Sequence, residues 1–309
     1  MPQPVVVHIG FHKTATTWLQ HEVFPHHPHL RSYVEGHPWD DPFLRCIVAD
    51  SDRRYDPVRA RAEYEAGLAR LGELAPDDVI VISAERLSGH AASGGYDTVR
   101  IARRLHEVLP EARVVMVVRS QVDMIESEYR QLVGEGHRGR LGSLWTSGAW
   151  KRVQFDLEHY EYDALVREYH RLFGAERVAV FTYELLAADR ERFLDRLADF
   201  FGVDSFKLDQ VSTRDVHPGL PNRGIGLLRL LNHFRRTELN PFPTVDLGVW
   251  WRGPIVAVGR RLPKRTHLVP RSKRAELAQR YQDSNQRLAA LLPDEDLGPF
   301  LQRLAKSVA

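Results

Sequence analysis

Four short apolar runs constrain the fold of this chain more than any other feature. They are rich in β-branched residues and nearly continuous in apolar positions: Val5–Ile9, Val79–Ile82, Val114–Val118 and Val178–Phe181. Strands that are buried on both faces, as in a parallel sheet, have this pattern. Helical patterns lie between the runs, at Thr98–Leu109, Gln154–Phe173 and Leu185–Phe201. Strands that alternate with helices predict an α/β fold, a three-layer sandwich around a central parallel sheet.

The pattern changes after Asp204. Helices are expected there at Arg223–Arg235, Ser272–Leu291 and Leu297–Lys306. An irregular stretch that contains Pro and Gly, Asn240–Pro270, separates the first helix from the second. A chain of 309 residues is long for one domain but still within its range. We therefore expect a single domain over residues 1–309, with an α/β core at 1–205 and a mostly helical C-terminal lobe at 206–309.

The distribution of charge is more informative than its sum. A net charge of +2 is too small to indicate nucleic acid as a partner. The segment Leu247–Ala275, however, contains eight Lys and Arg residues and no Asp or Glu. Three interpretations of this segment stay open: a solvated basic face, contact with an anionic acceptor, or peripheral contact with a membrane surface.

Cysteine content and the N-terminal residues bear on location. Cys46 is the only cysteine, so no disulfide within the chain can form. The first residues, MPQPVVVHIG, place no basic segment before the apolar run, which argues against a secretory signal. No apolar stretch approaches the roughly 20 residues that a membrane span requires. These features predict a cytoplasmic protein without a transmembrane segment.

The segment that joins the first strand to the next helix has the strongest functional signal. It reads HIGFHKTATTWLQ from His8 to Gln20. Backbone N–H groups at such a helix N-terminus attract anions. Lys13 adds a positive charge, and three threonines add hydroxyl donors. The segment predicts a cradle for phosphate or sulfate, and it is not a Walker A loop, because its lysine precedes the small residue.

The order Lys-Thr-Ala-Thr-Thr-Trp resembles the 5′-phosphosulfate loop of sulfotransferases that use 3′-phosphoadenosine 5′-phosphosulfate (PAPS). The resemblance implies a P-loop-like core, with the lysine at the bridging oxygen of the breaking bond, the loop around the 5′-phosphate and the tryptophan on adenine. The residues at those positions are Lys13, Thr14, Ala15, Thr16, Thr17 and Trp18. Ala15 stands where the family has glycine, and alanine costs about 1 kcal/mol if that position needs a positive φ. The alternative is a plain strand–turn–helix with a solvated lysine.

A second match follows the third predicted strand. Arg119 ends this strand, and Ser127 follows eight residues later on the next helix. This spacing resembles the 3′-phosphate site of the family, and a guanidinium with a serine hydroxyl suits a phosphate. The alternative is an arginine paired with Asp123 or Glu126.

Two weaker matches extend the resemblance from Val5 to about Gly224. Tyr183 follows the fourth strand, where the resemblance implies a contact with adenine, although a structural tyrosine fits equally. Asn222, Arg223 and Gly224 lie where relatives have a second loop that contacts the nucleotide.

The acceptor side needs a base, a cation on the leaving oxygen and alignment. Lys13 supplies the cation. Glu85 follows the second strand and would face the same crevice, because ligand sites in such sheets lie beyond the carboxyl ends of the strands. Burial would raise the pKa of this glutamate and make it a better base. The alternative for Glu85 is an ion pair with Arg86 or another neighbour, and His12 has no clear role in the family motif.

Further acceptor contacts are expected in the loop after the first helix, where family members often place them: Trp39, Asp40 and Asp41. Near the cationic segment, Trp250 and Trp251 are expected to form a buried pair, and the alternative is that their faces bind a sugar ring or an apolar ligand.

The sequence therefore predicts a sulfotransferase that moves the sulfuryl group from PAPS to a hydroxyl or amine and leaves 3′-phosphoadenosine 5′-phosphate (PAP). The acceptor is a carbohydrate, a lipid-linked molecule or a small metabolite, and no metal is required. One alternative is a small-molecule kinase with a P-loop-type core, which the missing Walker lysine disfavours. The other is a non-catalytic scaffold that binds PAPS or PAP.

Overall fold

A five-stranded parallel sheet forms the centre of the molecule. The computed structural model describes residues 3–34, 36–91, 94–143, 156–206, 222, 224–237, 239–243, 245–248, 250–261, 267–292 and 297–308. The strands are β1 (Val5–His8), β2 (Leu30–Ser32), β3 (Val79–Ser83), β4 (Arg113–Val118) and β5 (Val178–Thr182), in the order β2-β3-β1-β4-β5. Every pair of neighbouring strands is parallel. The four predicted strands are confirmed, and only the three-residue edge strand β2 was not expected.

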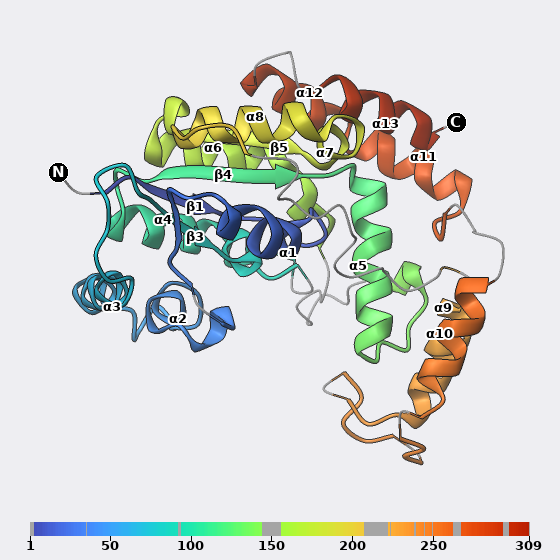
Figure 1. Ribbon diagram of the computed structural model, residues 1–309. Coiled ribbons are helices and arrows are strands. Elements are labelled where there is room, and N and C mark those ends of the chain that lie inside the picture. The colour runs from blue at the N-terminus through green and yellow to red at the C-terminus, as the bar shows by residue number, and fades with distance from the viewer. Residues whose placement is uncertain are drawn as a thin grey trace.

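Helices cover both faces of the sheet, which confirms the predicted sandwich (Figure 1). Residues of five helices share the apolar core on one face: α2 (Pro42–Val48), α3 (Pro57–Arg70), α4 (Thr98–Val108), α6 (Tyr162–Phe173) and α5 (Gln121–Glu135), which stands beyond the carboxyl end of β4 (Figure 1). The other face packs against α1 (Thr16–Trp18), α7 (Tyr183–Ala188) and α8 (Arg190–Phe201). Each layer of helices therefore has its own apolar core against the sheet.

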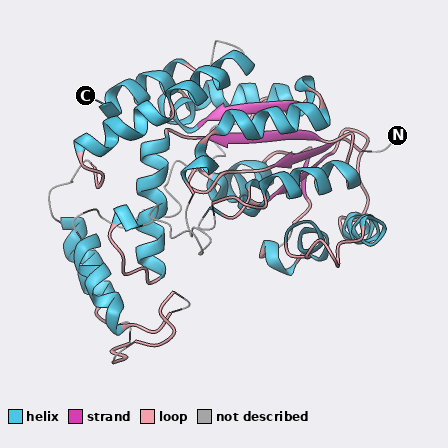
Figure 2. Cartoon of the chain, turned by 180° about the vertical axis from the view of Figure 1, so that it is seen from behind, coloured by secondary structure: helices cyan, strands magenta, loops and turns pink. Residues whose placement is uncertain are grey.

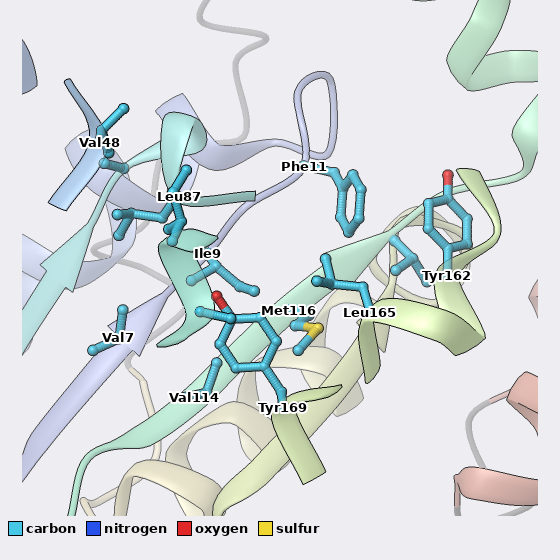
Figure 3. Packing of buried hydrophobic residues seen from close by; sticks show 14 of the residues in the cluster. Val7, Ile9, Phe11, Val48, Leu87, Val114, Met116, Tyr162, Leu165 and Tyr169 are labelled. Atoms are coloured by element: carbon cyan, nitrogen blue, oxygen red, sulfur yellow. The ribbon is translucent and has the colours of Figure 1, made fainter. Parts of the chain in front are cut away.

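The continuous apolar runs follow from this burial on two sides. Successive side chains of a strand point to opposite faces, so Val6 and Val115 lie in one core while Val7 and Val114 lie in the other. Figure 3 shows the second of these cores, where Val7, Val114 and their neighbours meet Tyr169 of α6.

Several predicted helices are shorter than expected or divided. The predicted helix at 185–201 is α7 and α8, separated at Asp189, whose side chain accepts a hydrogen bond from the Arg192 amide and caps α8. The predicted helix at 154–173 begins only at Tyr162, after a 3-10 turn over Leu157–Tyr160. Local caps of this kind end a helix even where the apolar pattern continues.

The C-terminal segments return onto the sheet-bearing body. They form α9 (Ile225–Leu231), α10 (Arg252–Arg261), α11 (Arg271–Arg280), α12 (Gln282–Leu291) and α13 (Gly298–Val308). Helix α12 packs on α6, α13 packs on α7, and both α9 and α11 pack on α5. Tyr281, Leu288 and Phe300 are buried in the same core as the sheet. The expectation of an irregular stretch at 240–270 was wrong, because α10 lies within it.

None of the helices among the residues just described is long and apolar enough to cross a membrane.

Candidate active site

The loop after β1 has a strained backbone. Lys13 and Ala15 have φ angles of 63° and 66°, in the left-handed region that glycine adopts most easily. Position 15 therefore has the positive φ that was the condition for strain there. Alanine at this position costs about 1 kcal/mol or more relative to an unstrained backbone. Gly10 permits a close approach in the same loop, because a Cβ there would collide with the hydroxyl of Thr16.

The three threonines of the loop have different roles. The hydroxyl of Thr14 donates a hydrogen bond to the carbonyl of Phe11 at 2.6 Å, so it braces the loop. The predicted contact of Thr14 with the nucleotide stays a prediction, and this hydroxyl is engaged within the loop. The hydroxyl of Thr16 is buried without a hydrogen-bond partner in the described chain, and Thr17 is half-buried. Thr16 thus keeps a hydroxyl from which a bound anion can accept a hydrogen bond.

Arg119 connects the exit of β4 to this loop. Its Nη1 donates to the carbonyl of Lys13 at 3.1 Å, and its guanidinium lies 4.3 Å from the centroid of the Tyr183 ring. Its Nε is buried and makes no hydrogen bond to the described residues. Three predicted site residues, from three separate strand exits, therefore lie together.

The alternative partners of Arg119 are engaged elsewhere. Asp123 accepts two hydrogen bonds from Arg303, at 2.6 and 2.7 Å. Glu126 accepts hydrogen bonds from the backbone amides of Leu268 and Val269. The alternative that Arg119 pairs with either carboxylate was wrong.

The remaining predicted nucleotide contacts surround α5. Ser127 is half-buried on this helix. One turn later, Arg130 Nη1 donates to Asn222 Oδ1 at 2.8 Å and holds Asn222 beside α5. Gly224 is buried directly before α9, and Arg223 lies outside the described residues.

Glu184 was not predicted but stabilises the same region. Its Oε1 accepts a hydrogen bond from the amide of Ser120 at 2.9 Å, which fixes the turn directly after Arg119.

Trp18 lies on the same side of the sheet as Tyr183. It is 8% exposed, and the guanidinium of Arg190 lies 5.4 Å from its ring centroid. Tyr183 is partly buried against the same apolar core. The two aromatic rings predicted to contact adenine thus share one core.

His12 and Glu85 form a hydrogen-bonded pair beside Lys13. His12 Nδ1 lies 3.0 Å from Glu85 Oε2. Burial lowers the pKa of His12, but the hydrogen bond to Glu85 and the charges of Glu128 and Glu85 outweigh it, so the pKa is raised above 6.5. The alternative for Glu85, an ion pair with Arg86 or another neighbour, holds for the neighbour His12 but not for Arg86, which pairs with Asp97 at 2.5 Å.

The pKa of Glu85 differs from the expectation. Burial alone would raise it, but the hydrogen bond from His12 and the charges of His12 and Lys13 lower the pKa of this carboxyl below 4.5. The sequence argument considered only burial and could not include a histidine from another strand exit. His12, which had no clear role in the motif, is the neighbour that decides the outcome.

Glu128 is a candidate that the sequence analysis missed. It is 4% exposed, and its Oε1 is buried without a hydrogen-bond partner in the described chain. Burial raises its pKa, while the positive charges of His12 and Lys13 oppose that shift. Asp123 and Glu126 on the same helix are also buried, but they have partners, as described above. The only sequence signal was the place of Glu128 next to Ser127.

A cavity of about 560 Å³ opens at the same edge of the sheet. The turn at 94–99 and the segment at 156–165 line it, with Tyr96, Val99 and His159 among the lining residues. The ring of His159 lies 5.3 Å from that of Phe11, which belongs to the loop after β1. The cavity therefore borders the loop that carries His12 and Lys13.

The predicted acceptor loop separates into exposed and structural residues. Trp39 and Asp40 are exposed. Asp41 is buried, caps α2 through the amide of Leu44 and pairs with Arg70 at 2.9 Å. Asp41 has a structural role, and the expectation that it contacts the acceptor was wrong.

Comparisons with known proteins identify the family of this chain. A model of the sulfotransferase family matches residues 4–207. The chain belongs to the sulfotransferase family, which supports sulfotransferase activity. No curated protein matches the chain.

Three solved structures are similar to this chain, and the first of them shows the same fold. A sulfotransferase from Alicyclobacillus acidocaldarius matches with a TM-score of 0.54 at 18% identity, over 94% of this chain and 96% of that one. A sulfotransferase domain from the curacin biosynthetic pathway has a TM-score of 0.46 at 12% identity, over 95% and 99% of the two chains. A mouse sulfotransferase complexed with PAP has a TM-score of 0.42 at 12% identity, over 94% and 89%.

Proposed function

We propose that the chain transfers the sulfuryl group from PAPS to a hydroxyl or amine, leaving PAP. The observation that carries this proposal is the junction of Arg119 with the carbonyl of Lys13. It joins the loop that suits a 5′-phosphosulfate to the strand exit that suits a 3′-phosphate. The unpartnered Thr16 hydroxyl and Arg119 Nε supply donors for the two anionic groups.

The proposed chemistry is an in-line displacement at sulfur. The acceptor oxygen or nitrogen forms a bond to sulfur while the bond from sulfur to the phosphate oxygen breaks, and the electron pair leaves with PAP. Lys13 stabilises the negative charge that develops on this leaving oxygen. The acceptor proton passes to His12 Nε2, while Nδ1 donates its hydrogen bond to Glu85. In this assignment Glu85, the base expected from the sequence, orients His12 and stabilises its charged form.

The cavity between the 94–99 turn and the 156–165 segment is the proposed site for the body of the acceptor. Its lining mixes an aromatic ring, an aliphatic side chain and carboxylates. Such a lining suits a carbohydrate, a lipid-linked molecule or a small metabolite that carries the reacting hydroxyl or amine.

The remaining expectations are also proposals. We infer one domain over residues 1–309, because C-terminal side chains share the core of the sheet. We infer a cytoplasmic location, since the buried Cys46 is a free thiol.

The donor can be tested by ligand-dependent stability. A ligand that binds only the folded state raises the melting temperature by mass action. We expect PAP to raise it more than ATP with Mg²⁺ does, because only PAP has a 3′-phosphate for Arg119 and Ser127. An equal rise with ATP and Mg²⁺ would favour the kinase alternative. A rise with PAP but no transfer from labelled PAPS to any acceptor would favour the non-catalytic scaffold.

A further inference from the structure

The segment that contains α9 and α10 exposes an unusual number of large apolar side chains. We call its described residues, 225–237, 239–243, 245–248 and 250–261, the arm. Figures 1 and 2 show the arm beside the C-terminal half of α5 and extending beyond its end, away from the sheet. The arm holds eight of the thirteen large hydrophobic side chains that are exposed in the described part of the chain: Leu227, Leu230, Leu239, Phe242, Val245, Leu247, Trp250 and Val258.

The structure of the arm holds these side chains outward. Asn240 Nδ2 donates to the carbonyls of Asn232 and Arg235, both at 2.9 Å. Asn232 Nδ2 in turn donates to the carbonyl of Val133 on α5 at 2.8 Å. The loop between α9 and α10 is therefore attached to the body through buried amides, and its exposed apolar residues belong to an ordered surface.

Two consecutive tryptophans show how this surface is built. Trp251 is 6% exposed and belongs to the main core, whereas Trp250 is 77% exposed. Phe242 is 90% exposed. The expectation of a buried tryptophan pair was wrong for Trp250, because neighbouring residues leave the backbone in different directions. The exposed rings remain without a described core to cover them.

The charge of the arm identifies the kind of surface that fits it. The described residues of the arm include six arginines, three of them on α10, which has no acidic residue. The acidic residues elsewhere in the arm segment are Glu238 and Asp246, and Asp246 pairs with Arg236 at 3.6 Å. Exposed aromatic and aliphatic side chains combined with excess positive charge suit the interface of an anionic bilayer.

We propose that the arm docks on an anionic membrane surface, with Phe242 and Trp250 at the boundary between headgroups and acyl chains. The aromatic rings gain by leaving water there, and the arginines of the arm gain by lying near anionic headgroups. A symmetric contact with a second copy of the chain is disfavoured, because it would bring the same positive segments together.

Docking has a consequence for the active site. Helix α9 packs on α5, and α5 carries Ser127 and Glu128. The docked arm therefore brings the candidate active site close to the membrane surface. If the proposed function holds, this placement favours a lipid-linked acceptor over the other classes.

Vesicle binding by the full chain tests the docking without any turnover. The probes are vesicles of phosphatidylcholine alone and vesicles that also contain phosphatidylglycerol, each followed by co-sedimentation. Each basic residue near an anionic surface contributes about 1 kcal/mol, so we expect at least roughly tenfold tighter binding to the anionic vesicles. Raising the salt concentration should weaken that binding. Absent binding, or equal binding to both vesicles, would overturn the proposal.

A double variant tests the assigned residues. Phe242→Ser combined with Trp250→Ser should weaken binding to the anionic vesicles about tenfold or more, with an unchanged melting temperature, because both side chains are exposed. The matched control is Val58→Ser on α3, where the side chain is also 77% exposed; it should bind as the wild type does. Equal binding by the double variant would overturn the proposal.

Sedimentation velocity provides the rival outcome. A wild-type dimer that the double variant converts to a monomer, with no vesicle binding by either, would assign the surface to a second copy of the chain. None of these experiments measures sulfuryl transfer. If the docking proposal fails, the proposed function is therefore still decided by its own tests of PAP binding and transfer.

Discussion

The carboxyl edge of the sheet and the arm depart from ordinary burial in opposite ways. At the sheet edge, polar atoms of Thr16, Arg119 and Glu128 are buried without partners in the described chain. In the arm, the large apolar side chains of Phe242 and Trp250 are exposed without a cover. Buried polar groups are normally satisfied, and large exposed apolar patches normally mark contacts. The difference fits the two partners proposed above, an anionic ligand for the Thr16 and Arg119 donors at the edge and an anionic membrane surface at the arm.

The largest expected effect concerns His12. His12→Ala should lower kcat/KM for an alcohol acceptor by about 10²–10⁴-fold, because no side chain then takes the proton. A nitrophenol acceptor should lose much less, since it ionises without help. The measurement is transfer from labelled PAPS to acceptors of graded pKa. An equal loss for all acceptors would remove His12 as the base.

Glu85→Gln separates orientation from proton transfer. His12 must be neutral to accept a proton, so the rate should rise with pH through its pKa, which Glu85 helps to raise above 6.5. Removing the charge of Glu85 lowers that pKa, and the acidic limb of the pH profile of kcat/KM should move to lower pH. If instead the variant loses activity equally at every pH while His12→Ala keeps it, Glu85 is itself the base, as the sequence suggested.

Lys13→Ala should have the next largest effect. Loss of one group that stabilises charge on the leaving oxygen should lower single-turnover transfer by about 10²–10³-fold for every acceptor. The nature of the acceptor should not matter, in contrast to His12→Ala. If the loss depends on the pKa of the acceptor, Lys13 acts on the acceptor and not on the leaving oxygen, and its proposed role is wrong.

Arg119→Ala should weaken PAP binding by roughly 1.5–3 kcal/mol, the range for hydrogen bonds to charged groups. An analogue without the 3′-phosphate should lose less, as calorimetry can determine. Arg113→Ala is the matched control, because Arg113 begins the same strand at the opposite edge of the sheet and donates to the carbonyl of Phe200. Equal losses for both ligands would make Arg119 structural.

Glu128→Gln at the sheet edge and Phe242→Ser in the arm compare the two regions through the free energy of unfolding. Because the folded-state pKa of Glu128 is raised, the unfolded chain loses this proton first, and the wild type loses stability as pH rises above about 4.5. The variant lacks that loss and should be more stable by on the order of 1 kcal/mol at neutral pH, with a smaller gain in acid. Phe242→Ser should change stability by less than about 0.5 kcal/mol. Urea unfolding at several pH values tests both; a pH-independent gain would contradict the buried, unpartnered carboxyl.

The smallest expected effect is at Ala15. With φ at 66°, Ala15→Gly should stabilise the protein by about 0.5–1 kcal/mol, because glycine adopts this conformation without the steric cost. Ala66→Gly on the exposed face of α3 is the same change in an ordinary helix and should destabilise by a similar amount. If both substitutions change the free energy of unfolding in the same direction, the loop is not strained at Ala15.

The sequence predicted well where one physical requirement fixed one pattern. Burial on two faces requires continuous apolar residues, so β1, β3, β4 and β5 were identified from their valines and isoleucines. Strand β2 was missed because it has only three residues, and Arg31 within it is exposed and pairs with Asp78 at 2.8 Å. Helix boundaries were missed where a side chain such as Asp189 forms a local cap.

The sequence by itself determined the parallel sheet, the loop after β1 that we propose as the anion site and the arginine at the exit of β4. Only the tertiary structure decided which charges have partners. Arg119 reaches a carbonyl 106 residues away in the sequence, and Glu85 pairs with His12 from another strand exit. It also decided that Trp251 is buried while Trp250 is exposed. The physical reason is that local pattern records the burial a segment needs, whereas pairing and pKa depend on atoms that distant segments bring within a few ångströms.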